Sequence, residues 1–278
     1  MQIVILILDG SNMSVFRGIK SFSVRPFAAF VAHGVEGFRD WRSARRVPVS
    51  LARDPATTPE PVIQVYCARC LGWRGYFGVH TWIAVKPACA KTYTVYEVTY
   101  WRLRRRGSAV ATRKRAPDQR WFGNMPQLLA EKRGDDVSAL IERIEKSIRV
   151  YPYGGHYRAW PGPNSNTFVA HIARAIPELE LDLPATAIGK DYIGRRWISA
   201  PPSGNGVQLS LFGLFGVVVS RVEGFEVNIL GLTFGFHPSI LALKLPVIGR
   251  LGVHRSFGPN TKPNNATTPA PIGDEVLR

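Results

Sequence analysis

Cysteine is scarce in this chain of 278 residues, which has three: Cys67, Cys70 and Cys89. An odd and small number of cysteines excludes a disulfide framework. Cys67 and Cys70 form a CxxC pair, but a structural zinc site needs four ligands, and neither a second CxxC nor a paired histidine follows. The pair also ends an apolar run typical of a strand, whereas a thioredoxin-type pair lies at a strand-to-helix turn. We therefore expect core or incidental cysteines, no metal site and no cofactor.

A standard secretory signal is also missing. Residues 1–8 are apolar, but Asp9 ends the run early and no basic segment precedes it. A second apolar patch at residues 27–35 is too short to span a bilayer, and at most it would rest on one.

Long uncharged apolar runs are absent even from the most apolar stretch, residues 207–236. Arg221, Glu223 and Glu226 divide it into two glycine-rich halves, each shorter than a membrane span. The β-branched residues on both sides of a Glu223-Gly224 turn favour a long β-hairpin. A hairpin that inserts into or rests on a membrane, and a pair of buried helices, are the alternatives.

Acidic residues are few, with 20 Asp and Glu against 36 Lys and Arg, so the formal net charge is +16. The arginines gather in two clusters, residues 39–46 and 102–115. Such a charge favours anionic partners, including membrane headgroups and acidic polymers, although a solvated basic face is the simpler alternative. No helix-turn-helix, zinc finger or RNP signature accompanies the clusters, so nucleic acid is not an expected partner.

The chain divides into three parts by composition. Residues 1–60 lack steady periodicity and end in the Pro/Thr-rich ARDPATTPEP, which is typical of a leader and linker. Residues 256–278 are rich in Pro, Asn and Thr and are predicted to be a disordered tail. The folded domain is therefore expected over residues 61–255, including the apolar hairpin at 207–236.

Within this domain the pattern predicts an α+β fold. Residues 62–68, 76–85 and 92–103 are rich in β-branched and aromatic residues, and turn-like breaks separate them, so an antiparallel meander is the simplest topology. Apolar residues then recur with helical spacing over residues 137–148, and a short apolar helix follows Asn164 until Pro177 ends it.

Three polar residues in this order of elements form a candidate catalytic site. His80 lies on a predicted strand, Glu97 on the next strand, and Ser165 at the start of the later helix, between Asn164 and Asn166. Unpaired N–H groups and the dipole at a helix start favour an anionic nucleophile and help to form an oxyanion hole. A histidine can take the proton and a third polar group can orient its ring.

Each of these residues also has a structural alternative. Asn and Ser are preferred helix N-caps, so Asn164 or Ser165 is equally explained as a cap. His80 shares a strand face with Trp82 and is either a surface residue or a covered one. Glu97 has many arginines with which to pair.

Several stretches resemble the bacterial domain of unknown function 3750 family over nearly all of residues 55–252. They include WRGYFGVHTWIAVKP, YTVYEV, YPYGGHYRAWPGPNSNTFVAHIAR and LDLPATAIGKDY. The family brings no assigned activity. Lys190 and Asp191 of the last stretch belong to the resemblance, but the sequence supplies no mechanism for them.

More remotely, YRAWPGPNSNTF resembles the permuted papain-like enzymes, such as the lecithin retinol acyltransferase group and the NlpC-type peptidases. The resemblance implies a permuted papain-like fold, with an antiparallel sheet packed against the nucleophile helix. It places His80 as the base, Glu97 as the third residue and Ser165 as the nucleophile, with Asn164 and Asn166 in support. Those enzymes use cysteine, so a serine here would depend on His80 for proton removal.

Two functions follow as hypotheses. The first is a hydrolase or acyltransferase that acts on an amide, ester or thioester bond, with lipid acyl groups or cell-wall peptides as substrates by analogy. The second is a catalytically silent binding module that uses its basic face and apolar hairpin at an anionic membrane or at cell-wall material. Both place the protein at a bacterial cell envelope rather than free in the cytoplasm.

Overall fold

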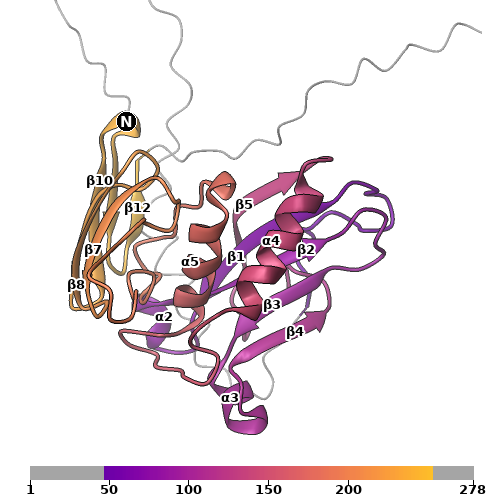
Figure 1. The fold of residues 1–278 in the computed structure, drawn as a ribbon, viewed down its shortest axis with the longest axis horizontal. Coiled ribbons are helices and arrows are strands. Elements are labelled where there is room, and N and C mark those ends of the chain that lie inside the picture. Colours follow the sequence, from indigo (N-terminus) through magenta and orange to yellow (C-terminus); the bar gives the residue numbers. More distant parts are fainter. Residues whose placement is uncertain (1–46, 253–278) are drawn as a thin grey trace, which may run out of the picture.

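The computed structural model describes residues 47–252, which form two antiparallel sheets and several helices (Figure 1). The predicted α+β class is confirmed at this level. Predictions for residues 1–46, including the apolar patch at 27–35, and for the tail from residue 253 lie outside the described residues. The boundary that we predicted between linker and domain stays a prediction.

The first sheet has the strand order β4-β3-β2-β1-β5, and every neighbouring pair is antiparallel. Its strands are β1 (Val62–Arg69), β2 (Val79–Lys86), β3 (Thr94–Val98), β4 (Val110–Lys114) and β5 (Gln127–Arg133). The β-branched and aromatic residues that predicted β1 and β2 are buried on both faces of the sheet. Such a sheet needs a cover on each side.

Two helices, α4 (Val137–Arg149) and α5 (Ser165–Ala175), cover one face. The apolar stripe of α4 predicted from its spacing is buried, with Ile144 fully so, and Phe168 of α5 packs into the same core. Loops cover the opposite face, where Trp82 Nε1 donates a hydrogen bond to the carbonyl of Pro117. The described part of the predicted linker belongs to this cover, since the N–H groups of Leu51 and Ala52 bond to Asp118.

Two predicted strands are shorter than expected because helices interrupt them. Helix α2 (Arg74–Phe77) occupies the start of the predicted strand 76–85. Helix α3 (Tyr100–Arg106) replaces the end of the predicted strand 92–103, because Thr99 caps it by accepting a hydrogen bond from the Arg102 N–H and Gly107 ends it with a positive φ. Cap and turn chemistry therefore overrides the β propensity of the aromatic residues.

The second sheet is a continuous antiparallel meander in the order β12-β11-β10-β9-β8-β7-β6. Its strands are β6 (Ile198–Ser199), β7 (Gly206–Leu211), β8 (Phe215–Ser220), β9 (Gly224–Ile229), β10 (Leu232–His237), β11 (Ala242–Leu245) and β12 (Gly249–Leu251). Two 3-10 turns, Pro177–Leu179 and Pro238–Ile240, complete the described elements. Helix α5 lies between this sheet and the first one (Figure 1).

The prediction of one long hairpin over residues 207–236 is wrong in its extent. Strands β8 and β9 do pair around the expected turn, but each half of the stretch is itself a hairpin. The extra turns fall at Phe212-Gly213 and Leu230-Gly231, where both residues have positive φ. A glycine in the second position is the usual sequence signal for such tight turns.

Candidate functional site

A cavity of about 410 Å³ opens at the start of helix α5. Most of its wall is apolar or aromatic, and three polar residues come from the helix start. The lining comprises Trp73, Arg74, Phe77, Gly78, Val79, Tyr157, Ala159, Trp160, Asn164, Ser165, Asn166, Ile188, Leu230 and Leu232. The three consecutive residues Asn164, Ser165 and Asn166 thus lie on the wall of this cavity.

Asn164 is the residue that caps the helix. Its Oδ1 accepts hydrogen bonds from the N–H groups of Asn166, at 2.9 Å, and Thr167, at 3.2 Å. Thr167 Oγ1 in turn accepts a hydrogen bond from the Asn164 N–H at 3.1 Å, which completes a capping box. The cap that we considered for either residue thus belongs to Asn164, and Ser165 is the first residue of the helix.

Strand β2 holds this helix start through Thr81. The Thr81 hydroxyl donates to the Ser165 carbonyl, at 3.1 Å, and to Asn166 Oδ1, at 3.0 Å. Asn166 Nδ2 also donates to the carbonyl of Val79 at 3.0 Å. Thr81 is therefore the β2 residue that faces the start of α5. No motif in the sequence singles it out, although its place beside His80 on a strand puts it on the same face as Ile83.

His80 points to the other face of the first sheet, because neighbouring residues on a strand alternate. Its ring stacks on Trp121, with centroids 3.7 Å apart and planes at 8°, and lies 5.8 Å from Trp82. Its Nε2 is 3.2 Å from Glu97 Oε2. The structure brings together His80 and Glu97 as predicted, but it places this pair across the sheet from Ser165.

Glu97 lies in a buried electrostatic pair with His80. Arg113 and Arg115 approach the Glu97 carboxylate at 3.5 Å and 3.8 Å, so the predicted alternative partners are present as well. Burial raises the pKa of Glu97, but the hydrogen bond from His80 and the nearby positive charges outweigh it and lower the pKa to about 2. Glu97 is therefore ionised at neutral pH and holds the His80 ring in place.

None of the described residues that line the cavity around Ser165 is a general base for its hydroxyl. Among the described lining residues, Arg74 and Tyr157 are titratable, and none is a histidine or a carboxylate. Burial raises the pKa of Tyr157 to about 12, so its phenol is neutral at pH 7. Ser165 is 3% exposed, and no described residue bonds to its hydroxyl. This arrangement suits recognition of a ligand better than nucleophilic attack.

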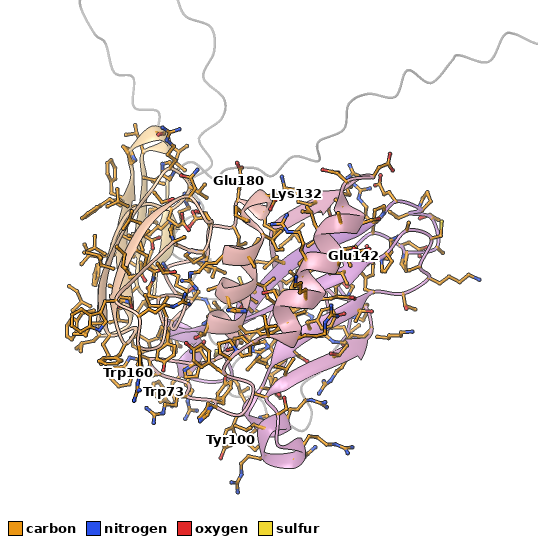
Figure 2. The ribbon with its side chains drawn as sticks, viewed as in Figure 1. Trp73, Tyr100, Lys132, Glu142, Trp160 and Glu180 are labelled. Atoms are coloured by element: carbon orange, nitrogen blue, oxygen red, sulfur yellow. The ribbon has the colours of Figure 1, made fainter. Side chains whose placement is uncertain are left out.

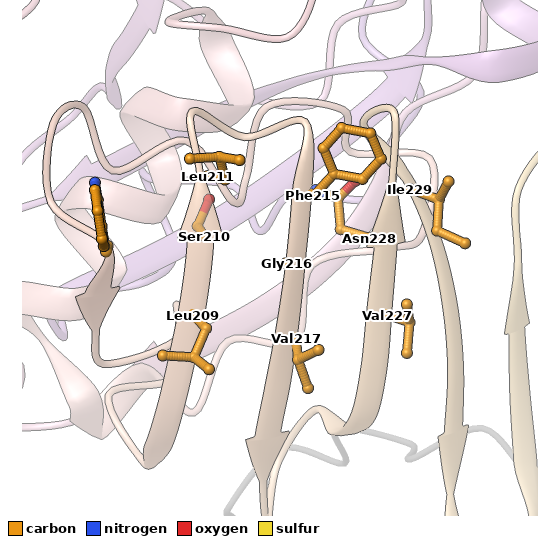
Figure 3. Close-up of a pocket in the computed structure, with 10 residues that line it drawn as sticks. Leu209, Ser210, Leu211, Phe215, Gly216, Val217, Val227, Asn228 and Ile229 are labelled. Atoms are coloured by element: carbon orange, nitrogen blue, oxygen red, sulfur yellow. The ribbon is translucent and has the colours of Figure 1, made fainter.

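The second sheet has an unusual distribution of side chains. One face, which we call the outer face, carries only apolar side chains on β7–β11: Val207, Leu209, Leu211, Phe215, Val217, Val219, Phe225, Val227, Ile229, Leu232, Phe234, Phe236, Leu243 and Leu245. Most of them are exposed, from 42% for Phe234 to 57% for Val219. Figure 3 shows Leu209, Val217 and Val227 in a row across neighbouring strands, beside a hollow of about 500 Å³.

The inner face of the same sheet carries the polar residues. They include Gln208, Ser210, Glu226, Asn228, Thr233, His237 and Lys244, all buried against the rest of the protein. An ordinary two-layer sheet has the reverse arrangement, with its apolar side chains toward the core.

Lys190 and Asp191 anchor this inner face. Lys190 Nζ bonds to Glu226 on β9, and Lys244 Nζ on β11 lies 2.6 Å from the other oxygen of Glu226. Asp191 accepts hydrogen bonds from Gln208 at 3.1 Å and from Asn228 at 2.9 Å. Burial raises the pKa of Glu226, but the two lysines outweigh it and lower that pKa, so the carboxylate is ionised. Lys190 and Asp191 thus have a structural role, attachment of the second sheet, which the sequence alone did not assign to them.

Residues 47–252 contain no group of three or more His, Cys, Asp or Glu side chains that could hold a metal ion. In the same part of the chain no helix is both long enough and apolar enough to cross a membrane.

Comparison with known proteins places part of the chain in a family. No curated protein and no solved structure gives a significant match. A family model described as "Protein of unknown function (DUF3750)" matches residues 60–192, which include His80, Glu97, the start of α5 and both anchoring residues Lys190 and Asp191. Strands β6–β12 lie beyond the match. The resemblance found in the sequence is confirmed over this segment, and residues 60–192 belong to the DUF3750 family.

Proposed function

We propose that this protein is a catalytically silent binding module that attaches to an anionic membrane surface through the outer face of its second sheet. The observation that carries the proposal is the composition of that face. Every strand position that points outward on β7–β11 is apolar, while the polar positions point inward. Four strands of six residues and one of four, spaced by ~4.8 Å, give this apolar face an area on the order of 500 Å², as large as the patches that soluble proteins use for binding.

The margin of the outer face favours a lipid partner. Arg195, Arg196 and Trp197 are exposed beside Ile198 at the β6 edge, and Trp197 is 72% exposed. At the turn between β9 and β10, Trp160 donates a hydrogen bond to the carbonyl of Leu230. Tryptophan and arginine beside an apolar surface suit the headgroup layer of a bilayer. The net charge of +16 adds attraction to anionic headgroups.

A hydrolase or acyltransferase function has less support from the site. The reaction needs a base within hydrogen-bond reach of Ser165, but Thr81 faces the helix start and His80 lies across the sheet. Threonine has no basic nitrogen. A serine that lacks a base suits a ligand-binding site.

We also propose a permuted papain-like origin for the unit formed by the first sheet and α5, and a place at a bacterial cell envelope. The order of His80, Glu97 and Ser165 along the chain and the packing of α5 on β2 support the first idea. The outer face supports the second.

Vesicle co-sedimentation tests the proposed function. We expect the protein to bind vesicles that contain phosphatidylglycerol, less in high salt, and to bind pure phosphatidylcholine more weakly. The double variant Val219→Glu/Ile229→Glu should lower the partition coefficient by about tenfold or more, because two charges would enter the interface. The matched control is Val150→Glu, which changes a 65% exposed valine beside α4.

Two results would overturn the proposal. One is equal vesicle binding by the wild type and the outer-face variant. The other is absence of vesicle binding together with a stable dimer that the outer-face variant abolishes, which would make a second copy of the chain the occupant of this face.

A further inference from the structure

The cavity at Ser165 continues the apolar surface of the second sheet. Leu230 follows β9 and Leu232 begins β10, and both line the cavity. Trp160 joins them and its ring packs against the Leu230-Gly231 turn, where a Cβ on Gly231 would lie 3.0 Å from Trp160 Nε1. Figure 2 shows Trp160 and Trp73, another wall residue, at the same end of the molecule. A molecule that leaves a membrane at this end of the sheet therefore meets an apolar wall.

The polar end of the cavity offers hydrogen-bond donors. The Ser165 side chain is almost fully buried, lines the cavity and has no partner among the described residues. The cap by Asn164 uses the N–H groups of Asn166 and Thr167, and it leaves the Ser165 N–H without a described acceptor. The helix dipole also places partial positive charge here.

The described residues that line the cavity carry positive charge and no negative charge. Arg74 lies on its lining, with its guanidinium 5.1 Å from the centre of the Trp73 ring. None of the described lining residues is acidic. The volume of about 410 Å³ suits the head and part of the chain of a small amphiphile.

We infer that this cavity binds a single-chain amphiphile with an anionic head, such as a fatty-acid carboxylate or an alkyl phosphate. The head accepts hydrogen bonds from the Ser165 hydroxyl and N–H and lies near Arg74. The chain lies against Trp160, Leu230 and Leu232 and leaves toward the outer face. This inference rests on the proposed membrane attachment, because the membrane is the source of the ligand.

Calorimetric titration with monomeric probes, below micelle-forming concentrations and without vesicles, tests the inference. Dodecanoate, dodecyl phosphate and dodecyltrimethylammonium share one chain and differ in the head. We expect one dodecanoate or dodecyl phosphate per protein and at least tenfold weaker binding of the cation. The tighter of the two anions identifies the head, a carboxylate or a phosphate.

Ser165→Ala should weaken binding of the anion about tenfold, since it removes a hydrogen bond to a charged group. Arg74→Gln should weaken it as well, whereas the control Arg104→Gln, on the exposed end of α3, should leave it unchanged. Leu232→Gln should weaken all three probes alike, because it changes the wall for the chain.

Equal binding of the anions and the cation, or anion binding that Ser165→Ala leaves unchanged, would overturn the inference. So would the absence of binding by both anions. These results are distinct from a failure of the proposed function, since Ser165→Ala retains the whole outer face and should bind vesicles like the wild type.

Discussion

The two sheets of this protein differ in which of their faces they bury. The first sheet has buried side chains on both faces, with α4 and α5 on one side and loops on the other. The second sheet buries its polar face and exposes its apolar face. Apolar burial therefore explains how the first sheet is held, but it does not explain how the second sheet is attached to the rest of the chain.

Ionic and hydrogen-bonded contacts attach the second sheet. Lys190, Asp191 and Arg174 reach its inner face, and Arg174 of α5 donates a hydrogen bond to Gln208 Oε1 at 2.8 Å. Buried ions tolerate little loss of a partner, because an unpaired charge stays behind in a poorly solvated place. The apolar side chains of the outer face therefore contribute little to this attachment and stay exposed.

The largest expected effect tests this attachment. Lys190→Met should lower the free energy of unfolding by ~3–5 kcal/mol, because it removes a buried cation from Glu226 and Asp191. Urea unfolding measures the change. The control Lys146→Met, on an exposed position of α4, should change it by less than ~0.5 kcal/mol. Similar small effects for both variants would show that apolar packing, not the ionic network, holds the second sheet.

A somewhat smaller effect is expected from the buried charge of the first sheet. The pKa of Glu97 in the folded protein, about 2, lies below its ordinary value of 4.5, so its contribution to stability is complete above pH 4.5 and is lost as the pH falls toward 2. The shift corresponds to ~3 kcal/mol. Glu97→Gln should remove this contribution at neutral pH and flatten the dependence of the unfolding free energy on pH between 4.5 and 2.

The matched control for this experiment is Glu142→Gln, which changes an exposed glutamate of α4. It should leave the pH dependence like that of the wild type. An unaltered acid transition in Glu97→Gln would contradict the assigned pairing of Glu97 with His80.

The sequence predicted the first sheet and its helices better than the second sheet. Strands β1 and β2 follow their content of β-branched and aromatic residues because both of their faces are buried. Helix α4 follows its hydrophobic spacing because one stripe of it packs on the core. The β-branched residues of 207–236 predicted the correct type of element, but not the number of strands. The turns at Phe212-Gly213 and Leu230-Gly231 depend on residues with positive φ, which hydrophobic spacing does not report.

The candidate site was likewise predictable from the sequence only in part. The order of His80, Glu97 and Ser165 along the chain predicted which elements would pack together, and His80 does meet Glu97. Whether His80 or Thr81 faces Ser165 depends on which side of β2 helix α5 covers. Local sequence leaves that choice open, since Trp82 makes the other side apolar as well. Tertiary packing decides it.

The most direct test of the account measures the depth of the outer face in a lipid bilayer. An environment-sensitive dye is attached at Ile229→Cys, or at Glu142→Cys as the control, in a chain whose exposed cysteine is replaced by Cys89→Ser. With phosphatidylglycerol vesicles that carry brominated acyl chains, we predict strong quenching at position 229 and little at position 142. Equal quenching at both positions, or none at position 229 while the protein is bound to vesicles, would contradict attachment through the outer face.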